Sequence, residues 1–296
     1  MTITEAELMS LTYGCELEYE GISQERAAKV VAQVTGGTAR YEGYHLHNWT
    51  VTTGDGRKWQ VVSDGSLYGT SAEVVTPILR YSDMETLQEV VRAMRKAKAK
   101  VNGRTGLHVH VGAQGMTPTQ IKNLVKIFYK QETLILKATG TQESRINSYT
   151  RKTDLGFVDK ICTMHNPTMA KLADAYYAGY HDRHSHYSRA RYHALNLHNL
   201  WNGTKGTVEF RYHEQSLHAG VIRAAVLIDL LMVLKAKSAK AASAKNPRPY
   251  SEASAKYDFR VFLLRLGANG ATFKSMRKHL CKNLPGSAAW KDGRHD

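Results

Sequence analysis

The segment GLHVHVG, residues 106–112, contains two histidines, His108 and His110, among residues that are otherwise small or apolar. In a β-strand, residues two apart share one face, so both imidazoles would point the same way. A zinc hydrolase could use such a pair as metal ligands. A histidine pair on a solvated strand face is the more ordinary interpretation. The two histidines alone leave both interpretations open.

Charged residues repeat this two-residue spacing in other segments that alternate like strands. The positions that would share faces are Glu16, Glu18 and Glu20 in TYGCELEYE, Glu73 in SAEVVTP, and Glu209, Arg211 and His213 in GTVEFRYH, while the turn SDGS adds Asp64 and Ser66. Neighbouring carboxylates repel unless a cation lies between them. The pair Glu16 and Glu18 therefore requires a metal ion or the guanidinium of Arg211.

The balance of ligand types favours magnesium over zinc. Four glutamates outnumber two histidines, and Mg²⁺ prefers carboxylate, water and phosphate oxygens. The sequence contains neither a phosphate-binding Walker loop nor a Gly-x-Ser-x-Gly nucleophile motif. We therefore expect an electrostatic site, in which metal ions and an arginine surround phosphate.

The elements that would position these residues form an α+β pattern. Alternating segments occur at residues 12–20, 41–44, 47–52, 58–63, 72–77, 107–112, 193–198 and 206–212, and helical segments at 23–34, 82–100, 218–236 and after 117. Ser82 and Glu85 would cap the second helix, and Thr117, Pro118 and Gln120 would begin the third. We expect one mostly antiparallel sheet with an ionic face and with helices packed on its apolar face.

Charge and composition limit the functional classes. The chain has 296 residues and a formal net charge of +15, with basic clusters at 92–104 and 235–249. A positive surface attracts nucleic acid, nucleotide or an acidic polymer, although solvated lysines are the simpler explanation for each cluster. The three cysteines form no paired motif, and the longest apolar run, 219–234, is too short to cross a bilayer. We expect a cytoplasmic protein without a membrane partner.

The motifs resemble those of the amidoligase family, a branch of the glutamine synthetase and glutamate–cysteine ligase superfamily. They occur in the order GCELEYEG, WQVVSDGSL, SAEVVTPIL, GLHVHVG, RYHALNL and GTVEFRYHEQSL. The resemblance implies a glutamine synthetase-like fold, in which a curved sheet forms a funnel that holds ATP and two or three Mg²⁺ ions, with Mn²⁺ as an alternative. It also implies ATP-dependent joining of a carboxylate to an amine through an acyl phosphate.

The resemblance also implies roles for individual residues. Metal ligands would be Glu16, Glu18, Glu73, His108 and Glu209; the nucleotide and substrate would contact His110, Asp64, Ser66, Asn196 and Arg211; and catalysis would depend on Arg211, Glu18 and Arg191. The carboxylate and amine substrates are not specified, and the basic surface favours an acidic or polymeric one.

Other parts of the chain have no counterpart in these motifs. They include the segment YYAGYHDRHSHYSR, residues 176–189, which would be a substrate lid or a surface loop. We expect a catalytic domain over residues 1–240 and a basic linker with a helical extension over 241–296, packed on the same domain. Two alternatives remain: a nucleic-acid-binding protein on a ligase scaffold, and a zinc hydrolase that uses His108 and His110.

Overall fold

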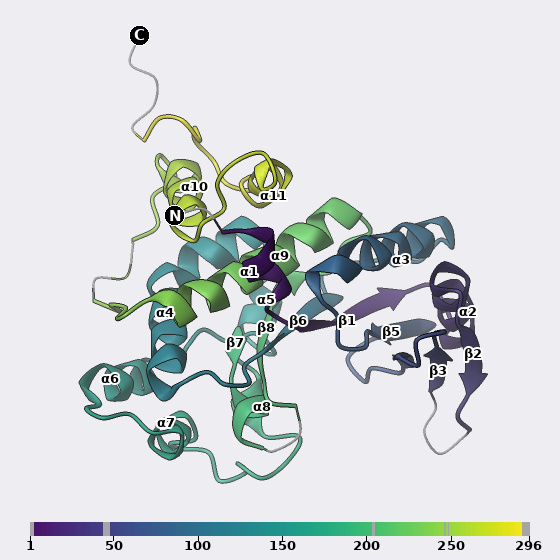
Figure 1. Ribbon diagram of the computed structural model, residues 1–296, viewed down its shortest axis with the longest axis horizontal. Helices are drawn as coiled ribbons and strands as arrows, with labels where there is room; N and C mark the ends of the chain where they lie inside the picture. Colours follow the sequence, from purple (N-terminus) through teal and green to yellow (C-terminus); the bar gives the residue numbers. More distant parts are fainter. Residues whose placement is uncertain (1–2, 44–47, 203–204, 246, 248, 292–296) are drawn as a thin grey trace.

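The computed structural model describes residues 3–43, 48–202, 205–245, 247 and 249–291. Its centre is an eight-stranded sheet with the strand order β2-β3-β4-β5-β1-β6-β8-β7 (Figure 1). The strands are β1 Tyr13–Glu20, β2 Thr38–Tyr41, β3 Trp49–Thr52, β4 Lys58–Val62, β5 Ser71–Val75, β6 Gly106–Gly112, β7 Leu195–Asn196 and β8 Thr207–Glu214. Every neighbouring pair in this order is antiparallel. The predicted α+β class with an antiparallel sheet is therefore confirmed; the predicted strand ends at Tyr44 and His47 lie outside the described residues.

The helices lie mainly on the apolar side of the sheet. They are α1 Glu5–Met9, α2 Gln24–Thr35, α3 Met84–Lys96, α4 Pro118–Thr139, α5 Glu143–Ile146, α6 Leu155–Thr163, α7 Met169–Tyr176, α8 His198–Trp201, α9 Ala219–Ser238, α10 Ala255–Arg265 and α11 Lys274–Leu280. In Figure 1, α3, α4 and α9 extend across one side of the sheet. The strand residues that face them, such as Leu17, Val109 and Phe210, are fully buried, so period-two alternation separates a dry face from a polar one.

Helix α9 is apolar around most of its circumference because other helices enclose it. It packs against α3 and α4 beside the sheet and against α1 and α11 on other sides. Such a helix needs no polar face. Among the described residues, no helix meets the length and hydropathy that crossing a membrane would require.

Local signals predicted one helix start correctly and another wrongly. At α4, Thr117 and Gln120 form a reciprocal capping box and Pro118 is the first residue, as expected. The predicted capping box of Ser82 and Glu85 is wrong, because a 3-10 turn over Tyr81–Asp83 precedes α3 and the helix begins only at Met84. Glu85 instead forms an ion pair with Arg92 of the same helix.

An extra residue in β8 changes which face its last residues occupy. The register passes from Val109↔Phe210 to Leu107↔His213, so β8 has one residue more than β6 between these pairs. Such a bulge reverses the alternation beyond it. The expectation that His213 shares the face of Glu209 and Arg211 is therefore wrong.

His213 lies on the helix side of the sheet, where Asp229 of α9 accepts two hydrogen bonds. His213 Nε2 is 2.8 Å from Asp229 Oδ2, and the Tyr212 hydroxyl donates to Oδ1 at 2.6 Å. All three side chains are buried. This network anchors β8 to α9 directly beside the polar face.

The chain after residue 240 contacts the same helical layer. Helix α10 packs on α4 and α11 packs on α9, and the Asn283 side chain donates to the carbonyl of Ala138 at 3.1 Å. These contacts support our proposal that residues 241–296 are an extension packed on the domain formed by residues 1–240.

Replacing Asp229 by alanine tests the anchor between β8 and α9. Asp229→Ala leaves two buried polar side chains without their acceptor, and we expect the free energy of unfolding to fall by about 3 kcal/mol. Urea denaturation followed by circular dichroism measures this. Asp159→Ala, at an exposed position of α6, is the control; equal losses in the two variants would contradict the anchoring role.

Candidate active site

The predicted site residues form a row across five neighbouring strands. The register pairs Glu73 of β5 with Glu18 of β1, Glu16 of β1 with His108 of β6, His110 of β6 with Glu209 of β8, and Glu209 with Asn196 of β7. Each of these side chains is buried or half-buried. The row is therefore set by strand pairing, and it collects residues that are almost 200 positions apart in the chain.

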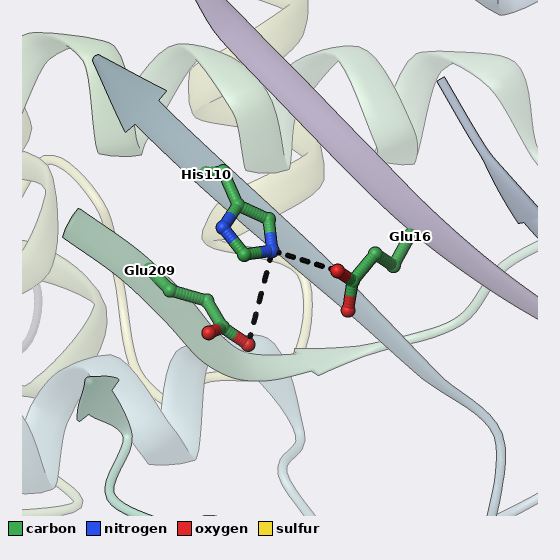
Figure 2. Close-up of side chains that lie close together, drawn as sticks. All are labelled: Glu16, His110 and Glu209. Carbon is green, nitrogen blue, oxygen red and sulfur yellow. Dashed lines mark hydrogen bonds and ion pairs between the residues drawn. The ribbon is translucent and has the colours of Figure 1, made fainter. Parts of the chain in front are cut away.

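Glu16, His110 and Glu209 form the first of two compact groups. Figure 2 shows them pointing toward one another from β1, β6 and β8. His110 Nε2 is 3.0 Å from Glu16 Oε1 and 3.9 Å from Glu209 Oε1. One ligand atom from each residue lies within 4.8 Å of the others, a spacing that could hold a metal ion. We call this group cluster A.

Charged and hydrogen-bonding neighbours keep the carboxylates of cluster A ionised. Burial opposes ionisation of Glu209, but the neighbouring Arg211 and then His110 lower its pKa to about 2. Arg211 Nη1 donates to Glu209 Oε1. Burial likewise opposes ionisation of Glu16, and here His110 and His108 hold the pKa well below its usual value. Cluster A therefore has two negative charges at neutral pH.

Two asparagine side chains donate hydrogen bonds to the second carboxylate oxygen of Glu209, Oε2. Asn196 Nδ2 and Asn199 Nδ2 donate to Glu209 Oε2 at 2.7 and 3.0 Å. Oε1 of Glu209 therefore faces His110 and Arg211, whereas Oε2 is held by the two asparagines. Asn196, which was expected to contact the nucleotide or the substrate, is placed here as a residue that positions Glu209.

Glu18, Asp64 and Glu73 form the second group, cluster B. Their nearest oxygens also lie within 4.8 Å of one another. Glu18 Oε2 accepts a hydrogen bond from the Gly106 N–H at 2.6 Å. Ser66 donates its N–H to Asp64 Oδ1 at 2.6 Å, so the DGS turn holds Asp64 toward the strands.

The three carboxyl groups of cluster B repel one another when they are ionised. Burial, followed by the charge of Asp64, raises the pKa of Glu18 to about 7. Burial together with Glu16, Glu18 and Asp64 raises the pKa of Glu73 well above its usual value. Three carboxyl groups in one buried space favour a bound divalent cation, because a cation removes this repulsion.

His108 lies between the two clusters. Its Nδ1 is 3.1 Å from Glu16 Oε2 and its Nε2 is 3.7 Å from Glu18 Oε1. Burial, and then the charge of Arg211, lower the pKa of His108 to about 4, so the ring is neutral at pH 7. If Nδ1 donates its proton to Glu16, the lone pair of Nε2 faces Glu18. His108 Nε2 could then act as a ligand to a cation in cluster B.

Arg191 is placed apart from both clusters. It ends the 3-10 turn Arg189–Arg191, and its Nη1 donates to the carbonyl of His186 at 3.2 Å. Its guanidinium lies 5.8 Å from the centre of the Tyr192 ring, and the guanidinium of Arg211 lies 6.0 Å from the same ring. Its predicted catalytic role therefore stays a prediction, with Tyr192 as the link to the site.

Sequence reasoning missed two cations at the site. Arg145 is buried and donates to the carbonyls of Arg211 and His213 at 2.9 and 2.8 Å. A side chain at Gly106 would meet it, because a Cβ there would lie 2.5 Å from Arg145 Nη2. Lys205 Nζ is 3.1 Å from Glu16 Oε1. Neither residue lies in a strand, so strand periodicity could not reveal them, and neither lies in one of the six motifs.

A cavity of about 650 Å³ opens beside cluster A. Its lining includes Glu16 and His110 together with three cationic side chains, those of Arg80, Lys205 and Lys237. Lys237 belongs to the basic stretch at the end of α9. The cavity thus combines a candidate metal site with positive charge, which suits a ligand that carries phosphate.

Comparison with known proteins agrees with the resemblance that the sequence motifs indicate. A sequence model of the family described as "Putative amidoligase enzyme" matches residues 9–232. No curated protein matches the sequence. Among solved structures, the chain is similar to one in the crystal structure of the complex between the prokaryotic ubiquitin-like protein Pup and its ligase PafA.

That structural similarity is distant. It has 10% sequence identity and a TM-score of 0.35, and it covers 94% of this chain and 64% of the matched chain. This chain therefore spans less than two thirds of the length of its match. A likeness of this degree carries no information about activity.

The pKa values of cluster B predict a stability that depends on pH in the metal-free protein. The pKa of Glu18 rises from 4.5 unfolded to about 7 folded, so its stabilising contribution is present below pH 4.5 and is lost as the pH rises through 7. In EDTA at pH 8, Glu18→Gln should therefore be more stable than the unmodified chain by about 3 kcal/mol.

Urea denaturation between pH 5 and pH 8 checks this, with Glu25→Gln at an exposed position of α2 as the control. The gain of the Glu18→Gln variant should shrink toward pH 5. A gain that is absent, or that is the same at both pH values, would contradict the repulsion inferred for cluster B.

Proposed function

The chain belongs to the putative amidoligase family, and from this premise we propose that it is an ATP- and Mg²⁺-dependent carboxylate–amine ligase. The observation that carries the proposal is the pair of acidic clusters on one sheet face, with Arg211 paired to Glu209 of cluster A. Phosphoryl transfer needs divalent ions and a guanidinium around phosphate, and it needs little other chemistry from the protein.

The residues present fit divalent cations. Cluster B offers only carboxylate oxygens, which suits Mg²⁺. Cluster A adds one imidazole nitrogen, which also suits Mn²⁺. Cluster B and the Nε2 of His108 would hold one ion, and Glu16, His110 and Glu209 a second. When bound, the ions would neutralise phosphate oxygens and polarise the phosphoryl group.

The protein's own cations would bind and orient the nucleotide. Lys205, Lys237 and Arg80 line the cavity beside cluster A and would contact phosphates. Arg211 is held in place at Nε by the carbonyl of Tyr149 at 3.3 Å and at Nη1 by Glu209. Its planar guanidinium would stabilise negative charge on the transferring group.

The reaction would proceed without a protein nucleophile. An oxygen of the carboxylate substrate would attack the γ-phosphorus of ATP and release ADP, and the resulting acyl phosphate would react with the amine. The new amide bond would form as phosphate leaves and the amine gives up a proton. Cys15 does not compete as a nucleophile, because its side chain is buried and burial raises its thiol pKa.

The alternatives have weaker support. Among the described residues, neither metal-sized group contains both His108 and His110, as a zinc hydrolase built on this pair would require. Part of the basic 235–249 stretch serves the site, since Lys237 lines its cavity. Binding of nucleic acid through the rest of that stretch stays a prediction.

Nucleotide binding should depend on the metal. We expect ATP to bind in the presence of Mg²⁺ or Mn²⁺, because the bound ions would neutralise the carboxylates of both clusters. In EDTA the carboxylates would repel the phosphates, and ATP should bind at least about tenfold more weakly. Glu16→Gln should also weaken the binding of ATP with Mg²⁺. Calorimetric titration measures both effects.

The matched control is Glu20→Gln. Glu20 lies on the same face of β1, but its carboxylate accepts from Asn102 at 2.7 Å and takes part in neither cluster. Equal affinity for ATP with and without EDTA would overturn the metal-dependent part of the proposal.

Arg211→Lys should lower turnover far more than it lowers nucleotide affinity. Lysine keeps the charge but cannot offer two parallel N–H donors, and loss of a guanidinium at this step typically costs a rate factor of about 10³. ADP release in the presence of carboxylate and amine substrates measures turnover, and Arg183→Lys, on an exposed segment, is the control. A variant with nearly full turnover would contradict the role of Arg211.

A further inference from the structure

A second cavity, of about 330 Å³, lies behind the edge strand β7. Leu195 and Leu197 line it, whereas Asn196 between them points the other way, to Glu209. The cavity is therefore on the opposite side of β7 from cluster A. Its remaining apolar wall comes from Val125 of α4, Phe157 of α6 and Tyr176 of α7, helices that pack together at this end of the sheet (Figure 1).

The segment 176–189, which the proposed ligase chemistry does not use, forms another wall of this cavity through Tyr176, residues 178–180 and Arg189. An internal hydrogen bond, from Ser188 Oγ to Asp182 Oδ1 at 2.9 Å, holds the segment together. The segment is thus folded against the cavity.

The polar groups of the cavity are arranged in a fixed way and are mainly positive. Arg151 donates to the carbonyls of Tyr192 and Arg189 at 3.2 and 2.7 Å and to the Tyr180 hydroxyl at 3.3 Å. His193 is held between the Lys152 carbonyl and the Tyr180 hydroxyl. Such a network leaves the guanidinium of Arg151 few ways to move.

The acidic group at the cavity already has a structural partner. Asp154 is the N-cap of α6 and accepts from the Phe157 N–H at 2.8 Å. Arg151 and Arg189 together outweigh this single carboxylate. The balance of charge therefore favours an anion, and the apolar wall favours a hydrocarbon group beside it.

We propose that this cavity binds a small carboxylate that carries an aromatic or branched apolar group. Cavities of a few hundred Å³ with an apolar lining and a few convergent polar groups are typical small-molecule sites. Arg189, an exposed residue that lines the cavity, would pair its guanidinium with the carboxylate, and Leu195, Leu197 and Phe157 would surround the apolar group. This site is separate from the clusters and goes beyond the proposed ligase activity.

The same cavity is joined to the active site by one hydrogen-bonded chain. The Tyr176 hydroxyl lies 2.6 Å from the Ala190 carbonyl and 3.3 Å from Asn196 Oδ1. Asn196 Nδ2 in turn donates to Glu209 at 2.7 Å. Because Tyr176 lines the cavity, a ligand that shifts its ring also shifts the amide that positions Glu209.

Binding is tested with 3-phenylpropionate as the probe and 3-phenylpropanamide as its neutral counterpart. Calorimetry on the full chain should show saturable binding of the carboxylate, and Arg189→Gln should weaken it by about tenfold, the effect of losing one charge-assisted contact. Arg183→Gln is the matched control, because Arg183 belongs to the same segment but pairs with Asp174 outside the cavity.

A second variant, Ala178→Phe, tests independently of Arg189 whether the probe enters the cavity. Ala178 is exposed at the mouth of the cavity, so Ala178→Phe should obstruct entry without disturbing the core. Absence of saturable binding, equal binding of the amide, or unchanged affinity in both Arg189→Gln and Ala178→Phe would overturn the proposal.

The connection to Glu209 has its own readout, which requires no metal and no turnover. In protein labelled with ¹⁵N-asparagine, the side-chain amide signal of Asn196, assigned by its loss in Asn196→Asp, should shift when the probe saturates the cavity. In Tyr176→Phe, which removes the hydroxyl, the probe should bind but the shift should vanish. A saturated cavity with an unchanged Asn196 signal in the unmodified chain would refute the connection.

Discussion

Five carboxylates share one polar face of the sheet, and they repel one another because they are buried or half-buried. Glu16, Glu18, Glu73 and Glu209 come from strands, and Asp64 comes from a turn. The protein relieves part of this repulsion itself, because Arg211 neutralises Glu209 and the histidines donate to Glu16. In cluster B, burial and mutual repulsion outweigh the Gly106 hydrogen bond and the more distant positive charges, and they raise the pKa of Glu18 and Glu73. We propose that a bound divalent cation relieves the repulsion that remains in cluster B.

The helix side of the sheet makes the arrangement rigid. The bulge in β8 lets Arg211 stay on the polar face while Tyr212 and His213 both reach Asp229 of α9. Arg145 then holds the carbonyls of Arg211 and His213 from the end of the strand. The backbone that carries Arg211 is therefore held both by the contacts of β8 with α9 and by Arg145. The asparagines of β7 and α8 do the same for Glu209.

Much of the site could be predicted from the sequence because a strand alternates with a period of two. That rule placed Glu16 and Glu18 on the polar face, and pairing in the sheet then brought Glu73, His108 and Glu209 beside them. A single sequence does not reveal which strands pair or in which register. It therefore did not predict that His110, and not His108, groups with Glu16 and Glu209 in cluster A. A bulge adds one residue without a local signal, which is why His213 was placed on the wrong face. Arg145 and Lys205 reach the site from outside the strands, where periodicity predicts nothing.

Ligation through an acyl phosphate can be tested by following the oxygens of the carboxylate substrate. A carboxylate that supports ADP release would be labelled with ¹⁸O at both oxygens, and the products would be analysed by mass spectrometry. We expect one ¹⁸O in the released phosphate and one in the new amide for each turnover, because a carboxylate oxygen bridges carbon and phosphorus in the intermediate. Phosphate free of ¹⁸O, with the label left in the product or in water, would contradict ligation through an acyl phosphate.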